Sequence, residues 1–403
     1  MPFEFSFTSE QKLLRKTCRA FFRDEILPTV EHYDKLEKFP EANIKRMAEL
    51  GFFGIMIPEK YGGVGMGEIE YGIVLEELGQ ICAAHATILG AHVGLCTLPL
   101  TLFGHEDQKT RFLPALARAE KLGAFALTEP QAGSDAASIR VTAVREKDEY
   151  VLNGSKMFCS NGDRADVIIV FAATDPSLGP RGGITAFVVE KEFSGFHVAK
   201  VEKKMGIRAS TTAELSFKDC RVPKENVLGE IGTGFRIALT ALDGGRVALA
   251  AGALGGAQAA LFSIFRLLKL LQKQGALSEH SESLLLLLAD TAIELRAARY
   301  LTYHALSDID KYFKTLAAGV RVPTTVRESF SRDSAIAKAF VSEVATRAIE
   351  RCLEAYGVLG LQEGLGIERD IRDSVISEIY DGTNEIQRLI IASDLLSRDE
   401  LVS

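Results

Sequence analysis

An aspartate on a glycine-containing turn is the first residue of this chain with the setting of a catalytic base. Asp381 and Gly382 precede Thr383 and an amphipathic run whose apolar residues recur at helical spacing. Gly382 permits a sharp backbone turn, and Thr383 can cap the helix that follows. The turn would direct the carboxylate of Asp381 into the cleft that it faces. For these residues alone, a capped surface turn with a solvated Asp381 is the favoured alternative.

A second candidate is the segment from Phe125 to Asp135, which joins an apolar strand-like piece to a polar loop. Gly133 permits close approach by a ligand, and Ser134 with neighbouring N–H groups can hold phosphate oxygens. Thr128 can hydrogen-bond a polar heterocycle. A polar β-turn is the alternative, and composition alone favours it.

Two further segments offer contacts to a flat or anionic group. Phe158 and Ser160 fall on one face of a strand by the two-residue period, so a ring and a hydroxyl could meet a planar ligand there. Arg246, after Asp243, stands near the start of a long helix, where it can recognise an anionic or carbonyl group. Phe158 as plain core, and Arg246 as a surface charge or helix-end ion pair, remain open.

The composition argues against several classes of protein. A net charge of −7 without a basic block argues against nucleic acid as a partner. Six cysteines without a C-x-x-C pair or metal-ligand spacing indicate a reducing compartment and no metal site. The first five residues show no secretory or Arg-rich transit pattern, and the longest leucine run is too short to span a bilayer. We expect a soluble cytoplasmic protein.

The elements that must position these residues fall into three regions. Helical spacing over 1–122 predicts a helical N-terminal domain, and β-rich runs over 123–230 predict a small antiparallel β barrel or sandwich. The pair Asn153-Gly154 is a strong hairpin signal within that β region. Helical spacing returns over 231–403, so the fold class is α+β. Its expected helices include 235–250, 257–272, 283–306 and 334–356.

Taken together, these segments resemble the acyl-CoA dehydrogenase family over essentially the whole chain. The number, order and spacing of the shared motifs make the resemblance specific. It implies a C-terminal four-helix bundle, FAD between the β domain and that bundle, and usually a homotetramer. The motifs are Leu-Thr-Glu-Pro from Leu127, Asn-Gly-Ser-Lys from Asn153, the run from Lys204 to Ser210, Gly245-Arg246, and Tyr380 to Thr383.

The resemblance also assigns roles by position. Phe158 stands where the family usually has a Trp packed on the flavin ring, and Ser160 where it has a Thr near flavin N5. Ser134 also faces the thioester, and Asp243 and Arg246 match the acyl and pantetheine end of the substrate. The implied cofactor-binding residues are Phe125, Leu127, Thr128, Ser134, Phe158, Ser160, Thr383 and Glu385.

The family reaction implies Asp381 as the base that removes the α-proton of an acyl-CoA, while the β-hydrogen leaves as hydride to the flavin. The resemblance further implies a 2-enoyl-CoA product and an electron-transferring flavoprotein as acceptor. Many members carry Glu at this turn, and others carry it at the position of Gly245. The shorter Asp381 withdraws the carboxylate by about an ångström, which indicates a cyclic or α-branched acyl group, with a plain chain left open.

Three further departures concern the tail of FAD. Leu271, Gln274 and Gly275 replace a family Arg-x-x-Phe-Gly that usually reaches the pyrophosphate of a neighbouring subunit. Glu354 replaces a Gln, and Val358 interrupts a Gly-Gly pair. Altered contacts to FAD, a heteromeric partner that supplies the missing Arg, and a smaller flavin all remain open. So do an oxidase or monooxygenase on the same fold and a weakly active subunit of a heterotetramer.

Overall fold

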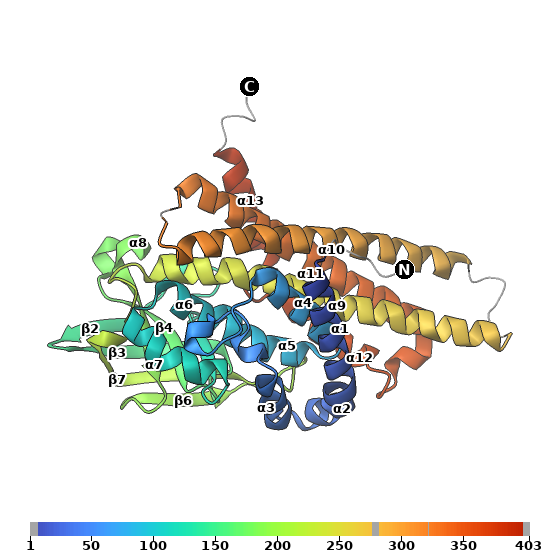
Figure 1. Cartoon of the computed structure of the whole chain (residues 1–403), viewed down its shortest axis with the longest axis horizontal. Coiled ribbons are helices and arrows are strands. Elements are labelled where there is room, and N and C mark those ends of the chain that lie inside the picture. The colour runs from blue at the N-terminus through green and yellow to red at the C-terminus, as the bar shows by residue number, and fades with distance from the viewer. Residues whose placement is uncertain (1–6, 276–281, 321, 398–403) are drawn as a thin grey trace.

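The computed structural model describes residues 7–275, 282–320 and 322–397. A β-sheet lies at one end of the molecule, and long helices cross it and extend beyond it (Figure 1). The predicted order of helices, sheet and helices is confirmed, and so is the α+β fold class. The domain boundaries at 122 and 230 stay a prediction. The first five residues, on which the expectation about targeting rests, lie outside the described range.

Helices form the N-terminal region. Thr8 caps the first of them, because its hydroxyl accepts from the Gln11 N–H while the Gln11 side chain accepts from the Thr8 N–H. The interior is aliphatic and aromatic. The elements are α1 (Ser9–Phe21), η1 (Phe22–Ile26), α2 (Leu27–Leu36), α3 (Glu41–Glu49), η2 (Phe52–Gly54), η3 (Glu59–Tyr61), α4 (Glu68–Gly79), α5 (Ala83–Gly90), η4 (Ala91–Thr97), α6 (Leu98–Phe103) and α7 (Glu106–Ala117).

One eight-stranded sheet forms the middle region. Its strands are β1 (Gly123–Ala126), β2 (Thr142–Glu146), β3 (Glu149–Ser160), β4 (Val167–Ala173), β5 (Ile184–Glu190), β6 (Phe196–Val201), β7 (Thr212–Pro223) and β8 (Val227–Leu228). They run in the order β6-β7-β3-β2-β4-β5-β8, with β1 beside β4. Most pairs are antiparallel, as predicted, but β1 and β2 run parallel to β4. The sheet is mixed because the chain between β1 and β4 crosses over through β2 and β3.

The predicted hairpin turn at Asn153-Gly154 is wrong. Both residues lie inside β3, where the pairing with β7 shifts between Leu152 and Gly154, and Gly154 takes a φ of +134°. The Asn153 side chain exchanges two hydrogen bonds with Asp219 on β7, at 3.1 and 2.9 Å. The pair therefore forms a bulge that a neighbouring strand stabilises. The chain reverses earlier, between β2 and β3, where Lys147 takes a φ of +56°.

Long helices form the C-terminal region, and the predicted four-helix bundle is present. The elements are α9 (Gly234–Lys273), α10 (Glu282–Ala317), α11 (Thr324–Tyr356), η8 (Gly357–Leu361), α12 (Ile367–Ser374), η9 (Val375–Glu378) and α13 (Asn384–Leu396). In the bundle, α11 packs against α9, α10 and α13. The stretches predicted at 235–250 and 257–272 are parts of one helix, α9.

The glycines between those two stretches of α9 allow the helix to pack closely against α4. A Cβ added at Gly255 would lie 2.1 Å from the Glu76 carbonyl oxygen, and one added at Gly79 would lie 2.1 Å from the Gly252 carbonyl oxygen. The backbones of α4 and α9 therefore meet directly, and side chains at these points would separate the helices. This close packing places α4 beside the helix that carries Arg246.

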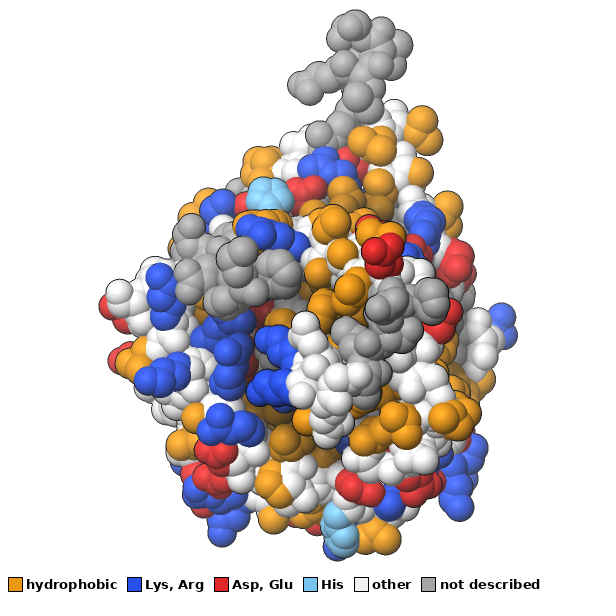
Figure 2. All heavy atoms as spheres, turned by 90° about the vertical axis from the view of Figure 1, so that its right-hand side faces the viewer, with side chains coloured by type: hydrophobic (Ala, Val, Ile, Leu, Met, Phe, Trp, Pro, Cys, Tyr) orange, Lys and Arg blue, Asp and Glu red, His pale blue; other side chains and the backbone are white. Residues whose placement is uncertain are grey.

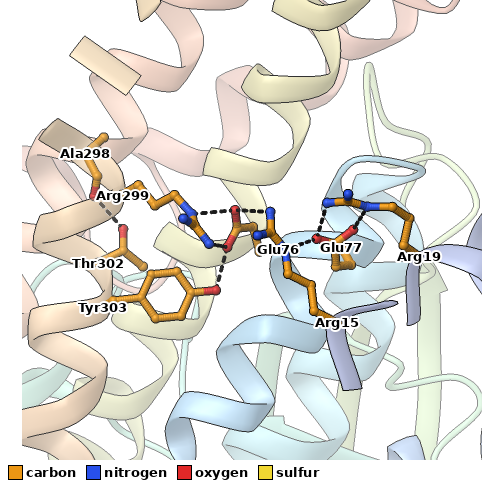
Figure 3. A network of polar contacts seen from close by, with 8 residues as sticks. All are labelled: Arg15, Arg19, Glu76, Glu77, Ala298, Arg299, Thr302 and Tyr303. Carbon is orange, nitrogen blue, oxygen red and sulfur yellow. Dashed lines mark hydrogen bonds and ion pairs between the residues drawn. The ribbon is translucent and has the colours of Figure 1, made fainter. Parts of the chain in front are cut away.

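A network of buried charges fixes α4 from both sides (Figure 3). Glu76 accepts from Arg299 on α10 at 2.9 Å. The adjacent Glu77 accepts from Arg15 at 2.7 Å and from Arg19 at 2.8 Å, both on α1. Because buried carboxylates are tolerated only when they are paired and hydrogen-bonded, these contacts hold three helices in one arrangement.

Two stretches, Ala83–Phe103 and Gly234–Lys273, are long and apolar enough to cross a membrane by length and composition. Their most apolar windows are 67% and 61% buried inside the protein. Both stretches therefore bury most of their apolar surface against other parts of the chain, as the core helices of a folded protein do.

Glu68, at the start of α4, makes the stability of the fold depend on pH. Burial, and secondarily the charge of Asp310, raises its pKa from 4.5 to about 8. The folded chain therefore holds one more proton than the unfolded chain between these values, and stability falls as pH rises through this window. We expect Glu68→Gln to gain on the wild type by up to about 1.4 kcal/mol per pH unit there. Urea unfolding at pH 5, 6.5 and 8 measures this gain, and a constant difference would contradict it.

Candidate active site

The turn that carries Asp381 has the predicted form. Asp381 takes a φ of +54°, in the left-handed region that residues other than glycine rarely adopt, and Gly382 takes +89°. Thr383 caps α13, because its hydroxyl accepts from the Ile386 N–H at 3.4 Å. The predicted cap is confirmed. Backbone strain at a non-glycine residue of this kind is concentrated at functional sites.

Two side chains hold the turn by its carbonyl oxygens. Gln387 Nε2 donates to the carbonyl oxygens of Asp381, at 3.2 Å, and Gly382, at 2.8 Å. Arg246 Nε reaches the same Asp381 oxygen from α9 at 3.4 Å. A Cβ added at Gly382 would lie 2.7 Å from Gln387 Nε2, so only glycine fits there without a shift. Gln387 was not predicted, because a buried glutamine in an amphipathic helix carries no recognisable pattern.

The carboxylate of Asp381 lies against α9. Its Oδ2 is 3.3 Å from the point where a Cβ on Gly245 would stand, and Leu95 Cδ2 is 3.1 Å from that point. Burial raises the pKa of Asp381, while the charges of Lys338 and Arg246 oppose the rise. A carboxylate in such a setting is a better proton acceptor than one in water. The absence of a side chain at Gly245 therefore leaves room for the carboxylate of Asp381.

Lys338 is a second residue that the sequence analysis missed. It is fully buried on α11, and its Nζ donates to Asn384 Oδ1, in the first turn of α13, at 2.8 Å. Burial lowers the pKa of Lys338 to about 8, while the charge of Asp381 opposes this change. Lys338 thus ties the start of α13 to α11 and brings a positive charge near the base. A lysine in an amphipathic helix usually faces solvent, so its spacing gave no signal.

Arg246 and Asp243 form a buried ion pair on α9. The Arg246 Nη1 lies 2.6 Å from Asp243 Oδ1, and both side chains are at most 5% exposed. The Ser331 hydroxyl also donates to Asp243 Oδ1 at 2.8 Å. The alternative that Arg246 is a surface charge is therefore wrong. Arg246 instead links the ion pair to the carbonyl of Asp381.

A second buried ion pair shapes the polar loop after β1. Lys156 Nζ donates to Glu129 Oε1 at 2.6 Å and to the Leu127 carbonyl oxygen at 2.9 Å. Glu129 also accepts from the backbone N–H groups of Arg140, at 2.6 Å, and Val141, at 3.0 Å. These bonds fix both ends of the loop to β3. In the sequence, Glu129 and Lys156 stand out only as parts of the Leu-Thr-Glu-Pro and Asn-Gly-Ser-Lys motifs.

A bulge in β3 turns Phe158 outward. The pairing with β7 shifts between Lys156 and Cys159, and Phe158 takes a φ of +54°. Its side chain is 62% exposed, so the alternative of a plain core residue is wrong. The bulge also interrupts the two-residue alternation from which Phe158 and Ser160 were predicted to share a face. An exposed aromatic side chain on a paired strand is suited to stacking on a planar ligand.

The structure brings most of the predicted cofactor residues of the middle region together. Thr128 O accepts from the Met157 N–H at 2.8 Å, and Cys159 Sγ donates to the Phe125 carbonyl oxygen at 3.3 Å. The segments that hold Phe125, Leu127 and Thr128 therefore lie directly beside those of Phe158 and Ser160. Ser134 is exposed on the loop, Thr383 caps α13, and Glu385 lies in the first turn of that helix.

Helix α5 connects this surface to the turn of Asp381. Asn161, next to Ser160, donates through Nδ2 to the Ile88 carbonyl oxygen at 3.1 Å. Burial raises the pKa of the Tyr380 hydroxyl, next to Asp381, and the adjacent Thr87 opposes this rise, so α5 also reaches the turn. The end of β3 and the turn of Asp381 thus both approach one short helix.

Known proteins match this chain over nearly its whole length. Family models match residues 8–120 as "Acyl-CoA dehydrogenase, N-terminal domain", 124–220 as the middle domain and 232–396 as the C-terminal domain. The chain belongs to the acyl-CoA dehydrogenase family. The short-chain specific acyl-CoA dehydrogenase of Clostridium acetobutylicum is 41% identical over 97% of this chain and 99% of its own length.

Solved structures of this family superpose closely. Butyryl-CoA dehydrogenase from Megasphaera elsdenii has a TM-score of 0.89 at 39% identity, over 98% of this chain and 100% of its own. The same values describe a chain from a structure of the electron-transferring flavoprotein of Acidaminococcus fermentans. An acyl-CoA dehydrogenase complexed with FAD from Bacillus anthracis has a TM-score of 0.86 at 35% identity, over 97% of this chain and 67% of its own.

The positions that depart from the family's FAD-tail pattern lie at ends of the bundle helices. Gln274 caps α9, and Gly275 follows it with a φ of +66°. Glu354 is exposed near the end of α11, and Val358 is 76% exposed in η8. Glu354 and Val358 therefore lie on the surface of the single chain.

Proposed function

We propose that this acyl-CoA dehydrogenase family member oxidises a short acyl-CoA thioester to the 2-enoyl-CoA, with Asp381 as the base. The observation that carries the proposal is the Asp381 carboxylate itself, which lies 3.3 Å from the Cβ position of Gly245 on a strained, clamped turn. Its carboxylate would take the α-proton. The backbone N–H of Asp381 donates to no described residue, which leaves it available to polarise the thioester carbonyl.

The surface around Phe158 supports FAD as the cofactor. An exposed aromatic ring, the polar Thr128 and Ser160, and the open Gly133 match the ring and phosphates of a flavin nucleotide. FAD, when bound, supplies the acceptor for the β-hydrogen. The Glu129–Lys156 pair holds the loop in place. The tail contacts at Gln274 and Glu354 would come from altered residues or from another subunit.

The short base supports a compact acyl group with a ring or a branch at the α-carbon. An aspartate reaches about an ångström less far than a glutamate, so a bulky α-carbon would restore the distance for proton transfer. The short-chain and butyryl-CoA relatives support a small acyl group as well. Cyclohexanecarbonyl-CoA represents a cyclic acyl group, 2-methylbutanoyl-CoA an α-branched one and butanoyl-CoA a linear one.

An anaerobic titration of the purified protein with these thioesters tests the proposal through the flavin absorbance band. We expect bleaching by the cyclic or branched thioester to be about 10-fold or more faster than by butanoyl-CoA. Asp381→Glu should reverse this order, because the longer side chain fits a linear chain and crowds a ring. A gain on all three alike would rule out the cyclic or branched group, and a flavin that no thioester bleaches would rule out the dehydrogenase.

Exposed apolar side chains support assembly into a homotetramer, or into a heteromer that supplies an arginine to the FAD tail. Leu361 is 74%, Leu389 62% and Leu396 88% exposed. Figure 2 shows apolar side chains spread over the end of the helical bundle. Patches of this kind mark contact surfaces between proteins. An electron-transferring flavoprotein is the proposed acceptor, and the cytoplasm is the proposed location.

A further inference from the structure

Two polar side chains on α4 are buried without hydrogen-bond partners. Glu68 and Tyr71 stand three residues apart and therefore share one face of the helix. Tyr71 is 0% and Glu68 2% exposed. Neither the Tyr71 hydroxyl nor either carboxylate oxygen of Glu68 has a partner among the described residues. Buried polar groups are nearly always hydrogen-bonded, so three such atoms on one face require an explanation.

The Tyr71 hydroxyl lies beside the helical turn that borders the base. A Cβ added at Gly94 would be 3.5 Å from the Tyr71 hydroxyl oxygen. The next residue, Leu95, contacts the point beside Gly245 that Asp381 Oδ2 approaches within 3.3 Å. The negative charge of Asp381 also contributes to the raised pKa of Tyr71. Tyr71 thus packs against the turn of η4 whose next residue, Leu95, borders the base.

Glu68 lies three residues before Tyr71 on α4. The charges of both Glu68 and Asp381 act on the hydroxyl of Tyr71, whereas the charge that acts on Glu68 is that of Asp310. Asp310 accepts a hydrogen bond from the backbone N–H of Glu68 at 3.0 Å and forms an ion pair with Lys314. Neither contact involves the side chain of Glu68. With a pKa of about 8, Glu68 is protonated at neutral pH and offers both a donor and an acceptor.

We propose that Tyr71 and Glu68 form a polar end to the acyl pocket, which takes an acyl group with an uncharged hydroxyl or carbonyl beyond its β-carbon. The inference rests on the proposed function, because it places the thioester at Asp381. A purely apolar chain would leave the hydroxyl of Tyr71 unpaired, whereas an oxygen on the chain would accept from it or donate to it.

Matched thioesters test this proposal by binding. Pentanoyl-CoA and 4-hydroxybutanoyl-CoA have the same shape, and so have hexanoyl-CoA and 5-hydroxypentanoyl-CoA. Their dissociation constants are measured by calorimetry on the FAD-loaded Asp381→Asn protein, which holds a thioester without turning it over. We expect a hydroxylated thioester to bind about 10-fold more tightly than its isostere. Adding Tyr71→Phe should reduce this ratio to about one, and so should Glu68→Leu.

Tyr300→Phe, the same change at an exposed site on α10, is the matched control and should leave the ratio unchanged. Equal binding of both isosteric pairs would overturn the proposal. A preference that survives Tyr71→Phe and Glu68→Leu would overturn it too, because the selective contact would lie elsewhere. Oxidation of the unsubstituted thioesters by the wild-type protein is measured separately, so a failure of the dehydrogenase reaction is distinguished from a failure of the polar end.

Discussion

Replacement of Asp381 by asparagine is expected to lower kcat by about 10³-fold or more while the protein keeps its flavin. General-base catalysis contributes roughly 10²–10⁴-fold, and Asp381 is the carboxylate that the strained turn presents beside α9. Asparagine keeps the shape of the side chain but cannot take the α-proton. Stopped-flow reduction with the best thioester measures the loss. A residual rate within 10-fold of the wild type would show that another group is the base.

Asp373→Asn is the matched control for this change. Asp373 is also buried, and burial raises its pKa to about 7, but it accepts the Ile207 N–H at 2.5 Å and does not face Gly245. An amide can still accept that hydrogen bond, so the reduction rate should stay within about threefold of the wild type. The two variants separate the loss of a base from the loss of a buried charge.

The order of the three regions was predictable because each element type has its own period. The long amphipathic helices and the β-rich runs before residue 230 follow that rule. The motif at Tyr380–Thr383 contains Asp381 and so identified the candidate base. The cap at Thr383 was equally local, since one side chain satisfies one nearby N–H. Local geometry of this kind needs no knowledge of the partners in space.

The parts that failed depend on such partners. The pair Asn153-Gly154 has the composition of a hairpin turn, but Asp219 on another strand satisfies Asn153, and a bulge results. Gln387 and Lys338 were missed for the same reason, because only tertiary packing buries them beside the turn. The stretches predicted at 235–250 and 257–272 are one helix, α9, and the glycines between and beside them allow α4 to approach closely. Apart from Gln387, whose hydrogen-bond partners lie five and six residues away, each miss is a contact between segments that lie far apart in the sequence.

Replacement of Glu129 by leucine is expected to destabilise the protein by about 3–5 kcal/mol and to lower its flavin content. The change leaves the fully buried Lys156 without its carboxylate, and it leaves the N–H groups of Arg140 and Val141 without an acceptor. Desolvation already lowers the pKa of Lys156 to about 8. Urea unfolding measures the stability, and the ratio of absorbance at 450 and 280 nm measures the bound flavin.

The double variant Glu129→Leu with Lys156→Met separates the two contributions. It removes the unpaired charge, so about half of the lost stability should return, while the Arg140 and Val141 amides stay unsatisfied and the loop stays displaced. Flavin content should therefore remain low even where stability recovers. Glu120→Leu, at the exposed pair with Arg118, should cost less than about 1 kcal/mol. If the double variant recovered flavin fully, the charge alone, and not the loop's backbone contacts, would order the cofactor surface.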